Sequence, residues 1–171
     1  MRFSRSRNTF RFIFPVAVSG NSFTNSIARG FSCGESRWLT KSKISFSKDK
    51  SPHKFEGDEE QLNRVFINLL KNSIESINEK KSKNAVFKGK INVDIKEDSD
   101  YIYVTVVDNG LGFAQVDKVK MLTPYFTTKK KGTGLGLAIV TKIINDHNST
   151  IFFNSIENGA KVEIVMPKKY D

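Results

Sequence analysis

A row of polar side chains inside one apolar stretch of the sequence could bind a metal ion and a phosphate group. Asn68, Asn72 and Glu75 follow one another at steps of four and three residues, so on a helix they share one face. Asparagine is a mediocre helix former because its amide competes for backbone hydrogen bonds. Its amide oxygen suits Mg²⁺, and its NH₂ group can donate to phosphate. The alternative is an exposed polar face that binds nothing.

A carboxylate stands where a second apolar stretch runs into glycines, at residues 108–112 (DNGLG). A carboxylate at the end of a strand can accept a hydrogen bond from an exocyclic amine such as that of adenine. The two glycines let the backbone turn and approach a ligand closely. An ordinary Asp-Asn-Gly turn is the alternative interpretation.

A second glycine cluster, residues 131–137 (KGTGLGL), opens a predicted helix. Free backbone N–H groups at a helix start favour an anion, and the helix dipole favours phosphate. A dinucleotide-binding fingerprint would require glycine where Leu137 stands, and the Gly-Lys-Ser/Thr of a P-loop is absent. The cluster therefore predicts phosphate binding by a different architecture.

The stretch just before this cluster, residues 123–129 (TPYFTTK), combines aromatic, hydroxyl and basic side chains. It suits a mobile cover in which Phe126 docks on the domain while lysines reach phosphates. The alternative is a plain loop with a run of charge.

The elements that position these groups follow from hydrophobic periodicity. A long helix is predicted over Asp58–Lys80, with Asp58 as its N-cap and acidic residues in its first turn. Shorter elements are predicted as strands at Lys43–Ser47, His53–Gly57, Ile91–Lys96, Tyr101–Asp108, Thr150–Asn154 and Lys161–Met166, and as a helix at Leu135–Asp146. This order predicts an α/β (α+β) two-layer sandwich, with helices on one face of a mixed, mainly antiparallel sheet.

Composition divides the chain near residue 40. Residues 1–40 are basic and rich in arginine and serine, which predicts a disordered or degenerate extension, although their start also resembles a targeting segment. Residues 41–168 form one predicted domain. The single Cys33 excludes an internal disulfide framework, and no apolar run reaches the roughly 20 residues of a membrane helix. The net charge of +10 suits a polyphosphate ligand, and by itself it also fits nucleic acid or an anionic membrane.

In their order and spacing, these segments resemble the ATP-binding catalytic domain of bacterial sensor histidine kinases. Residues 61–76 (QLNRVFINLLKNSIES) resemble the N box of that family, and residues 108–112 resemble the first glycine box. Residues 124–129 resemble the F box, and residues 132–137 resemble the second glycine box. The amino-acid sequence of these boxes is most similar to that of the nitrogen-regulation (NtrY/NtrB-like) branch of the family. The family fold is the Bergerat ATP-binding fold, which agrees with the predicted elements.

The resemblance implies ATP and Mg²⁺ as ligands. It implies that Asn72 coordinates the metal and Asn68 contacts the phosphate–metal cluster, both as catalytic residues, while Asp108 accepts from the adenine amine. The remaining nucleotide-binding residues that it implies are Lys71, Gly110, Gly112, Phe126, Thr127, Thr128, Lys129, Gly132, Thr133, Gly134, Leu135, Gly136 and Leu137. Glu75 stands where many relatives carry lysine, and no role is assigned to it.

The resemblance also bears on the reaction. Hydrolytic relatives carry a glutamate base where this chain has Asn68, and an amide cannot take a proton from water. Positioning and charge neutralisation remain, which is most of what phosphoryl transfer requires. The sequence therefore favours a kinase over an ATP hydrolase.

A complete kinase would present a phosphoacceptor histidine on a dimerising helical hairpin ahead of residue 43. The chain has only His53 and His147, and neither suits that role. The expected partner is therefore a phosphoacceptor domain supplied in trans, with a response regulator downstream, in the cytoplasm. Alternatives are a serine kinase or anti-sigma regulator of the same fold and a remnant that only binds ATP. A nucleic-acid-binding module is disfavoured, because aromatic residues are not interleaved on a basic face.

Overall fold

A computed structural model describes residues 11–13, 43–48, 54–113, 120, 123–127 and 132–168 of the chain. Within these residues the element order is β1 (Arg11–Ile13), β2 (Lys43–Lys48), β3 (Lys54–Glu56), α3 (Glu59–Lys83), β4 (Lys90–Glu97), β5 (Tyr101–Asp108), α5 (Gly136–Asp146), β6 (Thr150–Ile156) and β7 (Gly159–Pro167). The predicted boundary near residue 40 lies outside the described residues, and it stays a prediction.

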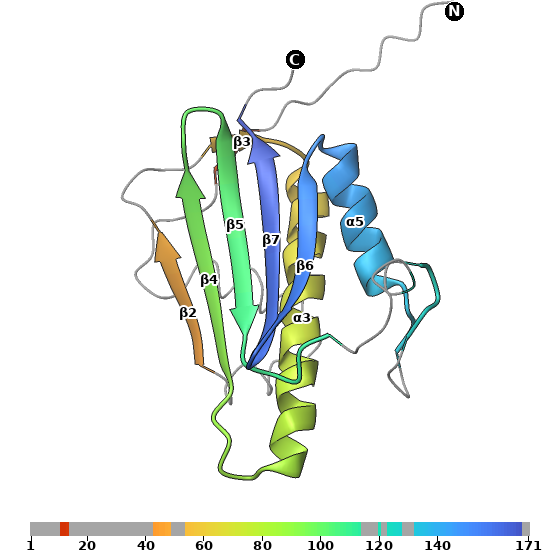
Figure 1. Ribbon diagram of the computed structural model, residues 1–171. Helices are drawn as coiled ribbons and strands as arrows, with labels where there is room; N and C mark the ends of the chain where they lie inside the picture. The colour runs from red at the N-terminus through yellow and green to blue at the C-terminus, as the bar shows by residue number, and fades with distance from the viewer. Residues whose placement is uncertain are drawn as a thin grey trace, which may run out of the picture.

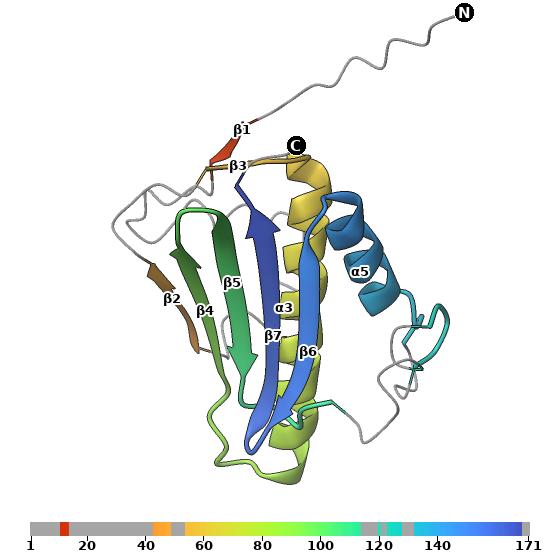
Figure 2. The same cartoon turned by 45° about the horizontal axis from the view of Figure 1, so that its top comes forward.

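The main sheet has the strand order β2-β4-β5-β7-β6. β2 runs parallel to β4, and every other neighbouring pair is antiparallel. A separate small sheet joins β1 to β3 in antiparallel register. Both α3 and α5 lie on the same face of the main sheet (Figures 1 and 2). This arrangement confirms the predicted two-layer fold and its mixed, mainly antiparallel sheet.

The long helix α3 begins where the sequence places its cap. The Asp58 carboxylate accepts a hydrogen bond from the Gln61 amide at 3.0 Å, and Glu59 and Glu60 occupy the first turn. These acids face the positive end of the helix dipole. The helix continues three residues beyond the predicted Lys80, because the lysines of its last turn suit the negative end of the dipole. It ends at Asn84, whose amide donates to the carbonyls of Lys80 and Lys81.

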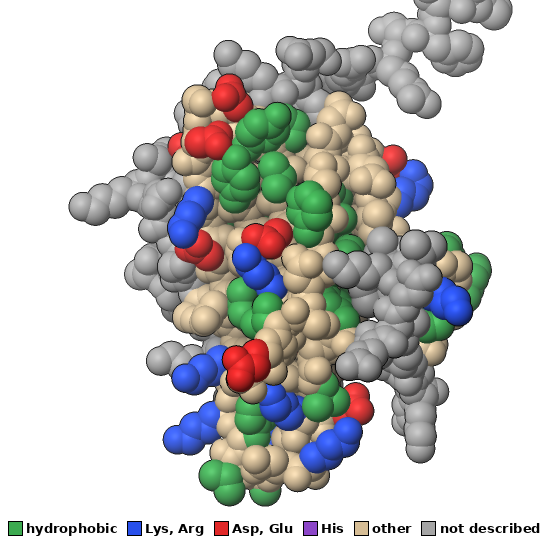
Figure 3. Space-filling view, in the orientation of Figure 1, with side chains coloured by type: hydrophobic (Ala, Val, Ile, Leu, Met, Phe, Trp, Pro, Cys, Tyr) green, Lys and Arg blue, Asp and Glu red, His purple; other side chains and the backbone are tan. Residues whose placement is uncertain are grey.

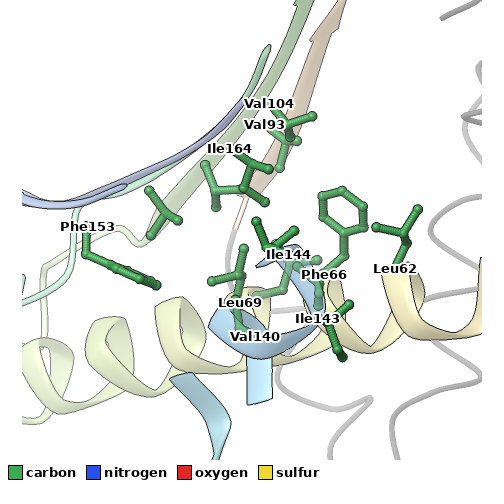
Figure 4. Packing of buried hydrophobic residues seen from close by; sticks show 14 of the residues in the cluster. Leu62, Phe66, Leu69, Val93, Val104, Val140, Ile143, Ile144, Phe153 and Ile164 are labelled. Atoms are coloured by element: carbon green, nitrogen blue, oxygen red, sulfur yellow. The ribbon is translucent and has the colours of Figure 1, made fainter. Parts of the chain in front are cut away.

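The core lies between the helices and the sheet. One stripe of α3 and the buried face of α5 meet the inward side chains of the sheet, which alternate along the strands as half-buried strands require. Figure 4 shows such side chains from both layers turned toward one another: Leu62, Phe66, Leu69, Val93, Val104, Val140, Ile143, Ile144, Phe153 and Ile164. Each fully buried side chain of this size contributes roughly 1.5–3 kcal/mol of stability.

Neither of the described helices lies on the opposite face of the sheet. Figure 3 views this face and shows apolar, acidic and basic side chains side by side, with basic side chains gathered toward the end where α3 finishes. Tyr101, Tyr103 and Phe152 are exposed. No described helix is long and apolar enough to cross a membrane.

A buried histidine joins the two helices at one end of the helical layer. The Nε2 atom of His147, just after α5, accepts a hydrogen bond from the Asp58 amide at 3.0 Å. Its Nδ1 atom lies 2.7 Å from the Ile143 carbonyl oxygen. Because a carbonyl oxygen can only accept, Nδ1 is the protonated nitrogen of the ring. The chain turns at the next residue, Asn148, which has a φ of 51° and so adopts the left-handed conformation that is common just after a helix.

Replacing Asn148 by alanine is expected to lower the free energy of unfolding by about 1 kcal/mol, because a Cβ-bearing residue without a local polar side chain is strained at positive φ. Replacing it by glycine should leave stability equal to or above that of the natural chain. Urea unfolding of the three proteins checks this. Equal stabilities for the alanine and glycine variants would contradict the left-handed geometry.

Candidate functional site

A cleft of about 320 Å³ opens between α3, the end of β5 and the start of α5. Its floor includes residues of β7, and its rim includes residues that precede α5. The lining residues are Asn68, Leu69, Lys71, Asn72, Ser73, Glu75, Ser76, Asp108, Gly112, Phe113, Phe126, Thr127, Gly132, Thr133, Gly134, Gly136, Leu137, Ala160 and Val162.

Asp108 lies at one end of the cleft, where β5 finishes. The residue is only 5% exposed. One carboxylate oxygen accepts from the Gly110 amide at 2.9 Å, and the other accepts from the Ser73 hydroxyl of α3 at 2.9 Å. A carboxylate has about four acceptor positions, so these bonds leave capacity for a ligand donor. Asp108 is therefore a preformed hydrogen-bond acceptor inside a largely apolar pocket.

Burial raises the pKa of the Asp108 carboxyl above its ordinary value. Hydrogen bonds from the amides of Gly110 and Ala160 and from the Ser73 hydroxyl oppose this rise, as does the positive charge of Lys80. A carboxylate held in an apolar cleft by several donors is typical of a binding or catalytic group.

The segment after Asp108 is packed tightly against its neighbours. A Cβ at Gly110 would lie 2.4 Å from the Ser76 hydroxyl oxygen, so only glycine fits there without displacing α3. Gly112 has a φ of 78°, and a Cβ there would lie 2.7 Å from the Gly159 carbonyl oxygen. The glycines thus serve close packing as well as turning. Gly110 itself lies behind Asp108 and does not line the cleft.

The other end of the cleft is formed by two asparagines and the start of α5. A Cβ placed on Gly136 would lie 3.6 Å from the Asn68 amide oxygen and 3.9 Å from the Asn72 amide nitrogen. Leu135 is the N-cap of α5 and makes no side-chain capping bond. The start of α5 thus lies beside the two asparagine amides and has no side-chain cap, and the free backbone N–H groups of a helix start suit an anion.

The residues before α5 are joined to one another by backbone contacts. The Tyr125 amide donates to the Gly134 carbonyl at 3.0 Å. Gly134 has a φ of 68°, and a Cβ there would lie 2.4 Å from the Tyr125 carbonyl carbon. Through this contact Phe126 and Thr127 stand beside Gly132 and Thr133 at the rim. Thr128 and Lys129, also predicted to bind the nucleotide, lie outside the described residues.

The structure thus brings together most of the residues singled out in the sequence. Asn68, Lys71, Asn72, Asp108 and Gly112 line the cleft. So do Phe126, Thr127, Gly132, Thr133, Gly134, Gly136 and Leu137, whereas Leu135 and Gly110 only support it.

Sequence reasoning missed several contributors to the cleft. Ser73 and Ser76 could have been found from the sequence, because a serine among the apolar residues of a helix needs a hydrogen-bond partner. Ala160 and Val162 come from β7, far along the chain, and no sequence pattern pointed to them. Glu75, which was left without a role, also lines the cleft.

The donor set of the cleft bears on metal binding. No group of three or more histidine, cysteine, aspartate or glutamate side chains that could hold a metal ion occurs among the described residues. Mg²⁺ needs no such cage, because it usually keeps several waters and takes one or two protein oxygens together with substrate phosphates. The Asn68 amide oxygen beside Gly136 fits that pattern, and the Asn72 amide lies beside the same residue.

Known proteins resemble this chain both in sequence and in fold. Residues 57–170 match the family described as histidine kinase-, DNA gyrase B- and HSP90-like ATPases. Sporulation kinase A of Bacillus subtilis is 38% identical over 127 residues, which are 74% of this chain and 20% of that protein. An NtrY-like sensor histidine kinase of Rickettsia felis is 43% identical over 108 residues, 63% of this chain and 17% of that protein. The chain thus spans about a fifth of the length of these relatives.

Solved structures agree with the sequence relatives. The nucleotide-free catalytic domain of histidine kinase ThkA superposes with a TM-score of 0.67 and 29% identity, covering 85% of this chain and 94% of that domain. The mycobacterial sensor histidine kinase MprB has the same TM-score at 21% identity and therefore supports the fold alone. The predicted resemblance to sensor histidine kinases is confirmed. The chain belongs to the family of histidine kinase-, DNA gyrase B- and HSP90-like ATPases, and it carries the ATP-binding catalytic domain of sensor histidine kinases.

Proposed function

We propose that the chain binds ATP together with Mg²⁺ and transfers the γ-phosphoryl group to a histidine supplied by another domain, from which a response regulator would receive it. One observation carries the proposal. A single cleft joins a buried acceptor carboxylate, Asp108, to the asparagine amides and helix start around Gly136. An adenine amine fits the first end, and an anionic polyphosphate fits the second.

The residues of the chain have separate parts in this proposal. Asp108 accepts from the adenine amine and fixes the base. Asn68 and Asn72 hold the phosphate–metal cluster against the amides at the start of α5. When bound, Mg²⁺ would neutralise phosphate charge. Because Asn68 offers an amide, it cannot act as the general base of ATP hydrolysis, and this supports transfer over hydrolysis.

The state of His147 supports an acceptor outside the described part of this chain. This histidine is 7% exposed, and both ring nitrogens are engaged, one with the Asp58 amide and one with the Ile143 carbonyl. A phosphoacceptor must offer a free ring nitrogen to the γ-phosphorus in line with the leaving oxygen. His147 would have to leave the core to do so.

Nucleotide binding with and without Mg²⁺ tests the proposal. Asn72→Ala is expected to weaken ATP binding in the presence of Mg²⁺ by about 10- to 100-fold and to have much less effect in its absence, because the lost amide acts on the metal cluster. Titration calorimetry of the whole chain measures both conditions. Binding that is unaffected by both Asn72→Ala and Asp108→Ala would sink the assignment.

Transfer itself needs a second component. Labelled ATP, the chain and a separately expressed acceptor hairpin from a relative should yield acid-labile, alkali-stable label on the hairpin. A hairpin whose histidine is replaced by glutamine is the control. Label on the control hairpin, or on a serine, would favour a kinase of another specificity.

A further inference from the structure

One lysine outside the cleft holds the segment that follows Asp108. The ammonium group of Lys80, on α3, donates to the Asn109 carbonyl at 2.8 Å and to the Gly110 carbonyl at 2.9 Å. The same ammonium group lies 4.8 Å from the centre of the Phe87 ring. Lys80 is not among the residues that line the cleft.

Lys80 is one of three polar side chains on successive turns of α3 that form hydrogen bonds with Asp108 and the segment after it. Ser73, Ser76 and Lys80 are spaced by three and four residues and share a face of the helix. The Ser73 hydroxyl donates to the Asp108 carboxylate at 2.9 Å, and the Ser76 hydroxyl accepts from the Leu111 amide at 2.8 Å. We call these three residues the α3 clamp.

The α3 clamp satisfies backbone polar groups of this segment on the side that faces α3. The Asn109 side chain ties the segment to β4 through the Lys90 amide and the Lys88 carbonyl. The carbonyls of Asn109 and Gly110 point the other way, toward α3, and Lys80 is their described donor. A charged donor shared by two carbonyls is stronger than a neutral one. It fixes where the Gly110 amide, and with it the Asp108 carboxylate, stands.

We infer that Lys80 is a positioning residue for adenine recognition, which sets the Asp108–Gly112 segment in its binding geometry before the nucleotide arrives. This inference rests on the proposed role of Asp108. The electrostatics agree: Lys80 is the charged group that acts on the Asp108 carboxyl and lowers its pKa, while the Ser73 hydroxyl and the Gly110 and Ala160 amides are the neutral donors. Burial acts in the opposite direction and is the larger effect.

The test uses the whole chain and three variants. Lys80→Met keeps an unbranched apolar stem against Phe87 but removes the charge and both hydrogen bonds. Lys80→Arg keeps the charge. Lys81→Met removes the neighbouring lysine, whose side chain makes no hydrogen bond or ion pair with the segment among the described residues. ATP affinity is measured by calorimetry from pH 5 to pH 8, and amide hydrogen exchange of residues 109–112 is measured without nucleotide.

Lys80→Met is expected to lower ATP affinity about tenfold at neutral pH, since two charge-assisted bonds are lost. Its binding should also fail at a higher pH than in the natural chain, because Asp108 then protonates more readily. Exchange of the Leu111 amide should be faster by about tenfold. Lys80→Arg should recover most of each effect, and Lys81→Met should show none.

Two results would overturn the inference: a Lys80→Met variant with unchanged exchange and affinity, or one whose melting temperature falls without any shift of the acid limb of binding. A natural chain that binds no ATP at all would instead sink the proposed function. The exchange measurement still decides in that case whether Lys80 holds the segment, so the two failures are distinguishable.

Discussion

Asp108→Asn is expected to weaken ATP binding by about 100-fold or more. The carboxylate offers only acceptors, whereas asparagine presents an NH₂ group on one side. In the variant, the remaining side-chain oxygen would accept from the Gly110 amide, as one oxygen of Asp108 does now. The NH₂ group would then stand where the other Asp108 oxygen accepts from the Ser73 hydroxyl. A site built to accept an amine would then leave buried polar groups unpaired, and sites of this kind discriminate strongly.

The same substitution should not lower the stability of the nucleotide-free protein near neutral pH. Burial raises the pKa of Asp108 in the folded state, so the folded protein binds this proton more tightly than the unfolded chain does. The contribution of Asp108 to the free energy of unfolding therefore falls as the pH rises from the ordinary pKa of an aspartate through the raised folded pKa. Asparagine does not titrate, and the variant should lose this pH dependence.

Asp98→Asn is the matched control in the turn between β4 and β5, at the opposite end of β5 from Asp108. Asp98 accepts from the Tyr103 hydroxyl at 2.7 Å, and this bond lowers the pKa of its carboxyl. Its stabilising contribution is thus present above the ordinary aspartate pKa and is lost as the pH falls through the folded value. Calorimetric ATP titration and urea unfolding at several pH values compare the two variants. Asp98→Asn should leave ATP affinity unchanged, and an Asp108→Asn protein with natural affinity would contradict the site.

Gly159→Ala is expected to be the most damaging single substitution for the fold, at about 3–5 kcal/mol of unfolding free energy. Gly159 has a φ of 133°, and a Cβ there would lie 1.9 Å from the Asp108 carbonyl oxygen. The methyl group cannot be accommodated by rotating a side chain, because the atoms that it would meet belong to the backbone of Asp108 and Asn109. It must push β7 away from β5 at the rung where Asp108 pairs with Ala160.

Thermal and urea unfolding measure the loss in Gly159→Ala, and ATP binding at low temperature tests its effect on the cleft. Asn158→Ala is the control, since Asn158 is exposed in the same turn and its φ is not positive. That variant should stay within about 0.5 kcal/mol of the natural chain. A Gly159→Ala protein of natural stability would mean that the two strands do not approach as closely as the structure has them.

Local signals in the sequence were enough to place the helices and strands. The apolar stripe and the Asp58 cap predict α3, and Tyr101–Asp108 is predicted with the bounds that β5 has. Alternation at 150–154 and 161–166 locates β6 and β7, although both strands run further than predicted, because strand length is decided by pairing with a partner.

The site could be predicted only in part, for a physical reason. Asn68, Asn72 and Asp108 stand out because their residue types conflict with their local structure, which is a signal a sequence carries. Lys80 and Ala160 carry no such conflict. One is an ordinary lysine near a helix end, and the other is a small residue in a strand. Their importance comes from partners far along the chain, at Gly110 and Asp108, and only the folded structure brings those partners to them.

The position of β7 in the sheet has a consequence for how the protein folds during synthesis. β7 is the last of the described strands in chain order, but it lies between β5 and β6 and supplies the amide of Ala160 to Asp108. While the ribosome still holds this segment, β5 and β6 have no common neighbour, and their apolar faces stay uncovered. Such surfaces attract chaperones and promote aggregation. The nucleotide pocket can therefore form only after release of β7 from the exit tunnel, and not gradually as the chain grows.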